Sequence, residues 1–218
     1  MQIKNFPKKK FKLIYADPPW SFKNYSIKGE PRNPKAHYDV MNLDDIKNLP
    51  VNTIADDDCI LLLWAIDPLL DKALEVIDSW GFKFKTVGFY WAKLNTTANI
   101  KNMDEKSFFT GLGYWTRANP EQCILATKGK PKRNSKAVKR FIVSHRREHS
   151  RKPDEIYQRI ETLADGPYLE LFSRSKRKGW KSWGNEKETF SKGSANTRKR
   201  PSKWIEEKNI DLFNYKKK

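Results

Sequence analysis

The chain has few residues of the types that build disulfide frameworks and zinc sites. It contains 2 cysteines and 3 histidines in 218 residues. Cys59 and Cys123 each lie inside an apolar run and are not paired by spacing, so the sequence encodes neither a disulfide framework nor a zinc knuckle. His145 and His149 are four residues apart, but no Glu or Cys accompanies them at metal-ligand spacing. We therefore expect no metal site.

Apolar runs of membrane-spanning length are also missing. The longest, residues 59–66, is far shorter than the roughly 20 residues that a transmembrane helix requires. The amino-terminal residues include Lys8, Lys9 and Lys10 and hold no signal-peptide apolar core. There is no internal repeat and no glycine-rich phosphate loop of the Walker or dinucleotide type. We expect a soluble, intracellular protein, cytoplasmic in a bacterial host cell, with no membrane partner.

Acidic residues are scarce relative to basic ones, and the excess is local. The chain has 44 Lys and Arg against 26 Asp and Glu, a net charge of +18. Residues 128–152 hold eleven basic residues and one Glu, and residues 174–218 hold fifteen basic and five acidic residues, so each segment carries +10 and the remainder −2. A basic surface confined to two segments is typical of proteins that bind a polyanion. We predict a nucleic-acid partner, with a merely solubilising surface as the alternative.

Strand-like and helix-like segments alternate along the chain. Six runs have strand length and composition: residues 12–16, 59–64, 82–93, 122–127, 140–143 and 168–172. Three segments have helical periodicity: residues 43–49, 67–80 and 153–163. Asn42 and Asp67 are candidate helix caps, and Gly81 is a candidate terminator. The alternation predicts an α/β fold with a mostly parallel sheet covered on both faces, in one domain over residues 1–190, followed by a basic, flexible or docked arm at 191–218.

A tetrapeptide directly after the first predicted strand is the most informative motif. Asp17-Pro18-Pro19-Trp20 places a carboxylate, two rigid residues and an aromatic ring where open α/β sheets bind ligands. The exocyclic amine of adenine is a poor nucleophile because its lone pair is delocalised into the ring. The Asp17 carboxylate and the Pro18 carbonyl can each accept one N–H and stabilise the developing positive charge. Pro19 would orient that carbonyl and Trp20 would stack on the base; an ordinary turn is the alternative.

Further motifs accompany the tetrapeptide in a fixed order. They are Tyr-Ala-Asp-Pro-Pro-Trp at 15–20, His-Tyr-Asp-Val-Met at 37–41, Leu-Leu-Leu-Trp at 61–64, Gly-Tyr-Trp-Thr-Arg-Ala-Asn-Pro-Glu at 113–121, Ser-Arg-Lys-Pro-Asp-Glu-Ile-Tyr at 150–157, Tyr-Leu-Glu-Leu-Phe-Ser-Arg at 168–174 and Trp-Gly-Asn-Glu at 183–186. In these motifs the chain resembles the MT-A70-like N6-adenine methyltransferases of the small bacterial or phage type. The resemblance implies a Rossmann-like methyltransferase fold in permuted order, with the catalytic motif ahead of the cofactor strand. It also implies S-adenosyl-L-methionine as the methyl donor.

The resemblance assigns individual residues to two halves of a site. Lys152 matches the lysine that meets the donor's carboxylate; simple membership of a basic run is the alternative. Asn185 and Glu186 match residues near the donor's ribose or adenine, although many relatives have Gln in place of this Glu. The donor set implied is Tyr15, Asp17, Lys152, Phe172, Arg174, Asn185 and Glu186. The substrate set is Trp20, Tyr38, Trp115 and Arg117, with a core role as the alternative for Tyr38.

By the same resemblance, three segments face the substrate: the loop after Trp20, the polar excursion at 95–119 and the basic stretch at 128–149. Glu121 is expected to hold one of them through Arg117. The target base must be flipped out of a duplex or presented on a single strand. The short chain, the lack of a zinc-finger module and the basic segments favour DNA over RNA. RNA N6-adenosine methylation, N4-cytosine methylation and an inactive nucleic-acid-binding homologue remain alternatives, and a homodimer or a pairing with a homologous subunit is compatible with the family.

Overall fold

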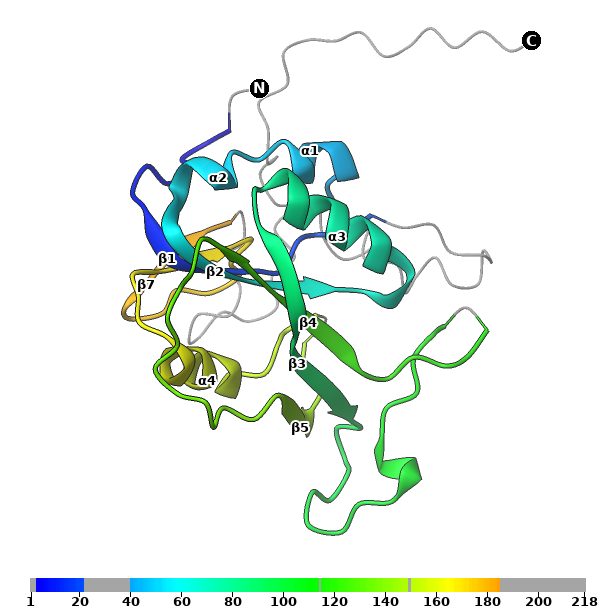
Figure 1. The fold of residues 1–218 in the computed structure, drawn as a ribbon. Helices are drawn as coiled ribbons and strands as arrows, with labels where there is room; N and C mark the ends of the chain where they lie inside the picture. The colour runs from blue at the N-terminus through cyan, green and yellow to red at the C-terminus, as the bar shows by residue number, and fades with distance from the viewer. Residues whose placement is uncertain (1–2, 22–39, 114, 149, 185–218) are drawn as a thin grey trace, which may run out of the picture.

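In the computed structural model, the described residues are 3–21, 40–113, 115–148 and 150–184, and within them the chain forms a seven-stranded sheet covered by helices (Figure 1). Tyr38, Asn185, Glu186 and the predicted arm at 191–218 lie outside these residues. None of the helices in the described ranges is long and apolar enough to cross a membrane.

The sheet has the strand order β5-β3-β4-β2-β1-β6-β7. Its strands are β1 (Phe11–Ala16), β2 (Ala55–Ala65), β3 (Lys83–Leu94), β4 (Glu121–Lys128), β5 (Phe141–His145), β6 (Tyr168–Leu171) and β7 (Trp180–Trp183). All neighbouring pairs are parallel except the two that involve β4, which runs antiparallel to β2 and β3. The predicted α/β class with a mostly parallel sheet is therefore confirmed. The short strand β7 was not among the predicted strands.

The helices are α1 (Leu43–Lys47), α2 (Val51–Ile54), α3 (Leu70–Ser79) and α4 (Glu155–Leu163), with 3₁₀ turns η3 (Asp67–Leu69) and η4 (Glu105–Ser107). The Asn42 cap is confirmed, because its side chain accepts the backbone N–H of Asp45 at 2.7 Å. Gly81 follows α3 with a φ of 80°, as the prediction of a terminator requires. Asp67 does not cap α3: it lies inside η3, and its carboxylate accepts from the side chain of Gln122.

Two apolar layers form because side chains alternate along each strand. Ile14 and Ala16 of β1 face the layer that includes Val76 and Ile77 of α3. Leu13 and Tyr15 of β1 face the opposite layer, which contains the apolar side of α4. Helices therefore cover both faces as predicted, with α1, α3 and the unpredicted α2 on one side and α4 on the other (Figure 1).

Strand direction gives the sheet two distinct edges. At one edge, which we call the carboxyl edge, β1, β2, β3 and β6 end and β4 begins. At the opposite edge, which we call the amino edge, those four strands begin and β4 ends. β4 runs from Glu121 at the carboxyl edge to Lys128 at the amino edge in 8 residues, so the two edges lie roughly 23 Å apart at about 3.3 Å per residue. Asp17 follows β1 at the carboxyl edge, where the tetrapeptide was predicted to lie.

Candidate active site

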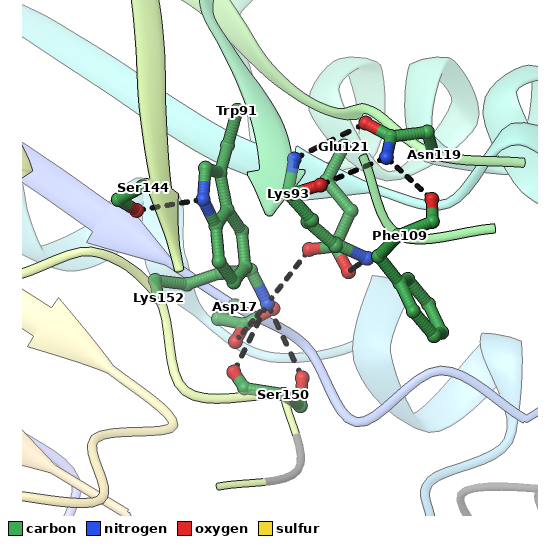
Figure 2. A network of polar contacts seen from close by, with 9 residues as sticks. All are labelled: Asp17, Trp91, Lys93, Phe109, Asn119, Glu121, Ser144, Ser150 and Lys152. Carbon is green, nitrogen blue, oxygen red and sulfur yellow. Dashed lines mark hydrogen bonds and ion pairs between the residues drawn. The ribbon is translucent and has the colours of Figure 1, made fainter. Parts of the chain in front are cut away.

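Four charged residues from separate parts of the chain meet at the carboxyl edge (Figure 2). The Lys152 Nζ lies 2.7 Å from Oδ2 of Asp17 and 3.2 Å from Oε2 of Glu121. The Lys93 Nζ lies 2.5 Å from the other Glu121 oxygen, Oε1. Positive and negative groups therefore alternate along a chain from Lys93 through Glu121 and Lys152 to Asp17. We call these four residues the charged quartet.

Backbone position explains how the charged quartet assembles. Asp17 directly follows β1, Lys93 is near the end of β3, and Glu121 is the first residue of antiparallel β4, so all three reach the same edge. Lys152 precedes α4, and Ser150 fixes it by accepting from its ammonium at 3.2 Å through Oγ and 3.4 Å through the carbonyl oxygen. The Lys152 ammonium also lies 5.2 Å from the centre of the Trp64 ring. These contacts hold the Lys152 cation at the junction between the two carboxylates.

Burial and charge act in opposite directions on the two carboxylates. Burial raises the pKa of Asp17, although the Lys152 ammonium opposes the shift. Burial also disfavours ionisation of Glu121, but Lys152 and Lys93 together outweigh it and lower the pKa of Glu121 to about 2. Glu121 is therefore a fixed anion, whereas Asp17 is the member of the quartet more ready to take a proton.

The tetrapeptide forms a tight turn that backbone hydrogen bonds hold in place. The Pro18 carbonyl accepts the backbone N–H of Trp20 at 2.8 Å, which uses one of its two lone pairs. The Pro19 carbonyl accepts the backbone N–H of Met41 at 3.0 Å, and Trp20 and Met41 form a parallel bridge. The chain on both sides of residues 22–39 is thus joined beside Asp17.

Trp20 occupies a different position from the one predicted. Its side chain is only 5% exposed and belongs to the apolar layer under the turn. Its indole N–H donates to the backbone carbonyl of Trp64 at 3.0 Å. This buried position corrects the expectation that the ring is presented to the target base: in the structure Trp20 fastens the tetrapeptide turn to β2.

A cleft beside the charged quartet contains the predicted donor residues that the structure describes. Its lining includes Tyr15, Asp17, Lys152, Glu170, Phe172 and Arg174. Tyr15 contributes from β1, where its hydroxyl accepts the indole N–H of Trp64 at 2.6 Å. Phe172 follows β6 with a φ of 62° and packs edge to face on Trp183. Residues as far apart in the chain as Tyr15 and Arg174 therefore share one cleft.

Glu170 is a buried carboxylate in this cleft that the sequence analysis did not identify. It is 8% exposed, and one of its oxygens, Oε1, accepts the Tyr157 hydroxyl at 2.9 Å. The other, Oε2, has no hydrogen-bond partner among the residues described. Burial raises the pKa of Glu170 to about 7. A buried acceptor without a partner inside a cleft is free to bind a donor group of a ligand.

The excursion between β3 and β4 is attached at its base to the charged quartet. The side chain of Asn119 donates to the carbonyls of Lys93 and Phe109, and its oxygen accepts the Lys93 N–H at 3.1 Å (Figure 2). Trp115 lies fully exposed on this excursion, and Arg117 is exposed as well. Glu121 pairs with Lys93 and Lys152 and not with Arg117, which corrects the expected contact.

The basic stretch at 128–149 was expected to face the substrate as a whole, and the structure divides it. Residues 146–148 follow β5 and lie near the site, where Arg147 donates to the Lys152 carbonyl at 2.9 Å. Residues 128–136 instead follow the end of β4 at the amino edge, and Asn134 bonds the Leu163 carbonyl at the end of α4. In Figure 1 this connection runs on the side of the molecule away from the 95–120 excursion.

Sequence reasoning missed Lys93, Ser150 and Glu170. A signal existed for two of them. Lys93 is a single charge at the end of an aromatic strand, and Glu170 is a charge inside the apolar run Tyr168–Phe172. Charged residues in or at the end of a buried strand must have a partner, because an unpaired buried charge is costly. Ser150 has no comparable signal, since its role depends on the fold of the segment before α4.

Comparisons with known proteins find similarity over most of the chain. The MT-A70 family model matches residues 11–186. The chain is 31% identical over 198 residues to the Type II methyltransferase M.MunI of a Mycoplasma species, a match that covers 83% of this chain and 79% of that protein. It is 29% identical over 179 residues to the N(6)-adenosine-methyltransferase MT-A70-like of Arabidopsis thaliana, covering 81% of this chain and 24% of that protein. It is 28% identical over 181 residues to the N(6)-adenosine-methyltransferase catalytic subunit METTL3 of Homo sapiens, covering 81% of this chain and 28% of that protein.

Proposed function

The chain belongs to the MT-A70 family of methyltransferases, and from this premise we propose that it transfers a methyl group from S-adenosyl-L-methionine to the N6 amine of adenine in DNA. The observation that carries the proposal is the contact between Asp17 and Lys152 across 135 positions of sequence. Asp17, whose carboxylate suits the target amine, thus lies beside Lys152, whose ammonium suits the carboxylate of the donor. Members of this family generally use S-adenosylmethionine.

The cleft residues fit the polar groups of this donor. A cation at Lys152 suits a carboxylate, and the unpartnered Oε2 of Glu170 suits an ammonium or a hydroxyl group. The rings of Tyr15 and Phe172 offer apolar surface beside these charges. We assign Asn185 and Glu186 to the same donor site on the resemblance alone. When bound, the donor supplies a methyl carbon attached to a positively charged sulfur.

The protein's own groups act on the amine. Lys152 contacts Oδ2 of Asp17 and leaves the second oxygen, Oδ1, able to accept one N–H of the amine. The second lone pair of the Pro18 carbonyl can accept the other N–H. These two acceptors stabilise the positive charge that grows on the nitrogen as the new N–C bond forms and the methyl carbon's bond to the donor sulfur breaks, with its electron pair left on the sulfur. Because burial raises the pKa of Asp17, its carboxylate is suited to take the proton that the methylated nitrogen then releases.

Lys93 and Glu121 maintain the position of Lys152. Glu121 is a fixed anion that holds the Lys152 ammonium from the side opposite Asp17, and Lys93 offsets the second negative charge. Without Lys93, the Lys152 cation would be shared by two carboxylates with no other compensation. The quartet thus keeps a neutral balance of charge while it aims one cation at the cleft.

The coverage of the relatives supports DNA over RNA. The match spans 79% of M.MunI, a Type II methyltransferase, but only about a quarter of the relatives named for N6-adenosine. The chain is therefore similar to nearly all of a Type II enzyme and to one part of the larger ones. The N6 position is supported by the names of those larger relatives. Basic residues beside the site, such as Arg146 and Arg147, supply the charge that phosphates require.

The test is methyl transfer from a radiolabelled donor to DNA and RNA oligonucleotides of matched sequence, followed by digestion to nucleosides. We expect label in N6-methyl-2′-deoxyadenosine. Label in N6-methyladenosine would move the substrate to RNA, and label in N4-methyl-2′-deoxycytidine would move the reaction to cytosine. Donor binding without labelled product on any oligonucleotide would instead support an inactive nucleic-acid-binding homologue.

A further inference from the structure

The amino edge of the sheet carries a second basic surface, on the side of the molecule opposite the candidate active site. Nine basic residues gather where β1 and β3 begin and β4 ends, against four aspartates from the start of β2 and the turn before β6. The basic residues are Lys8, Lys9, Lys10, Lys83, Lys128, Lys130, Lys132, Arg133 and Lys136, and the acidic ones are Asp56, Asp57, Asp58 and Asp165. We call this set the amino-edge surface.

Specific contacts fix the backbone that carries these charges. The backbone N–H of Lys130 donates to Oδ1 of Asp58 at 2.6 Å. Gly129, with a φ of 63°, lies so close to Asp57 and Asp58 that a Cβ at this position would collide with both. Asn134 donates its backbone N–H to the Leu163 carbonyl and its side chain to Asp165, both at 2.8 Å. Two of the four acidic side chains therefore serve to hold the loop, on which Lys130 and Lys132 are exposed.

Within this surface, two cations crowd onto one acceptor. The Lys10 Nζ lies 3.1 Å from the Ala55 carbonyl oxygen, and the Lys128 Nζ lies 3.3 Å from the same atom. Two ammonium groups that share one neutral acceptor repel each other, and an anion between them would relieve that repulsion. Lys130 and Lys132 are exposed on the same loop. The local chemistry thus favours a multiply charged anion over a single carboxylate.

The distance between the amino-edge surface and the candidate active site determines whether one nucleic-acid duplex could contact both. The two edges lie roughly 23 Å apart on opposite sides of the molecule, and a DNA duplex is stiff over about 150 base pairs. A duplex segment that presents its base at the carboxyl edge cannot also bend around to the amino edge. We propose that the amino-edge surface binds the phosphate backbone of a second nucleic-acid segment, so that one chain holds two segments. The proposal rests on the nucleic-acid part of the proposed function.

Counting bound duplexes tests this proposal. The probe is a fluorescent 16-base-pair DNA duplex (a length chosen at roughly 54 Å) in excess over the full chain at low salt, with the complex analysed by native mass spectrometry. We expect two duplexes for each chain. The double variant Lys130→Gln with Lys132→Gln should retain one. When the salt is lowered further until this variant also binds a second duplex, the slope of log K against log salt for that step should be shallower than the parent's by about 2, since each lost phosphate contact contributes about 0.9.

A charge-matched control separates a local contact from a general loss of charge. Lys101→Gln with Lys106→Gln removes two exposed lysines from the excursion at the other edge, and this variant should still bind the second duplex. Methyl transfer by the amino-edge variant should stay within about twofold of the parent. The proposal would be overturned if the parent bound only one duplex per chain, or if the amino-edge variant still bound two. It would also be overturned if both variants lost the second duplex equally. Because the count needs no turnover, it remains decisive even if methyl transfer itself is not found.

Discussion

The substitution Glu121→Gln tests the charged quartet most sharply. The pKa of Glu121 falls from its ordinary 4.5 to about 2, because the attraction of Lys152 and Lys93 outweighs the effect of burial. A shift of about 2.5 units corresponds to about 3 kcal/mol of stabilisation at neutral pH. The Glu121 side chain is 19% exposed, so solvent screens this interaction only in part. Glutamine keeps the shape but removes the charge that holds two buried cations in place.

The sign of the effect fixes its pH window. A depressed carboxyl pKa gives stability that is fully present above pH 4.5 and is lost as the pH falls towards 2. Urea unfolding should therefore show the variant less stable than the parent by about 3 kcal/mol at pH 7, and the gap should shrink at pH 3. The control is Asp154→Asn, which loses its contact with Arg147; that carboxylate is 58% exposed, and the change should cost less than about 1 kcal/mol. A gap for Glu121→Gln that is absent at pH 7, or equal at both pH values, would refute the reasoning.

Three further substitutions address the neighbouring groups. Trp20→Phe removes the indole N–H that donates to the carbonyl of Trp64 and should lower the free energy of unfolding by about 0.5–1.5 kcal/mol, measured with urea; an unchanged value would contradict the fastening role. The raised pKa of Glu170 means that the folded protein disfavours its charged form, so the parent should lose stability as the pH rises from 4.5 through about 7. Glu170→Gln should remove this loss, which melting temperatures measured against pH without ligand can check. Parallel curves of melting temperature against pH for parent and variant would argue against it. Lys152→Gln should weaken binding of the donor's demethylated product at least tenfold by titration calorimetry, and equal affinity would remove Lys152 from the donor site.

Local patterns were sufficient to predict most of the fold. The apolar runs that became β1, β2 and β4 were recognisable because a strand buried on both faces is continuously apolar. Strand β7 escaped because its four residues, Trp180–Trp183, are separated by polar side chains and are too short to show a period. The antiparallel direction of β4 was also not predicted, since a run of apolar residues has no direction.

The candidate site was predictable in membership and less so in geometry. The family resemblance assigned Asp17 and Lys152 to one site, and the structure brings them to 2.7 Å. The inward position of Trp20 depends on an acceptor 44 positions away, the Trp64 carbonyl, which no local pattern reveals. The division of the basic stretch between two edges depends on the direction of β4. The basic segments of the sequence therefore predicted a nucleic-acid partner, but they did not indicate which face of the molecule carries each group of basic residues.

The most direct test of the central claim is single-turnover methyl transfer by Asp17→Asn on an adenine-containing DNA duplex. Asparagine preserves size but removes the carboxylate that is proposed to accept the amine. We predict that, at saturating donor, the rate falls at least about a hundredfold while the unfolding midpoint stays close to that of the parent. A rate within threefold of the parent, at saturating donor and unchanged folding, would contradict the role of Asp17 as the acceptor.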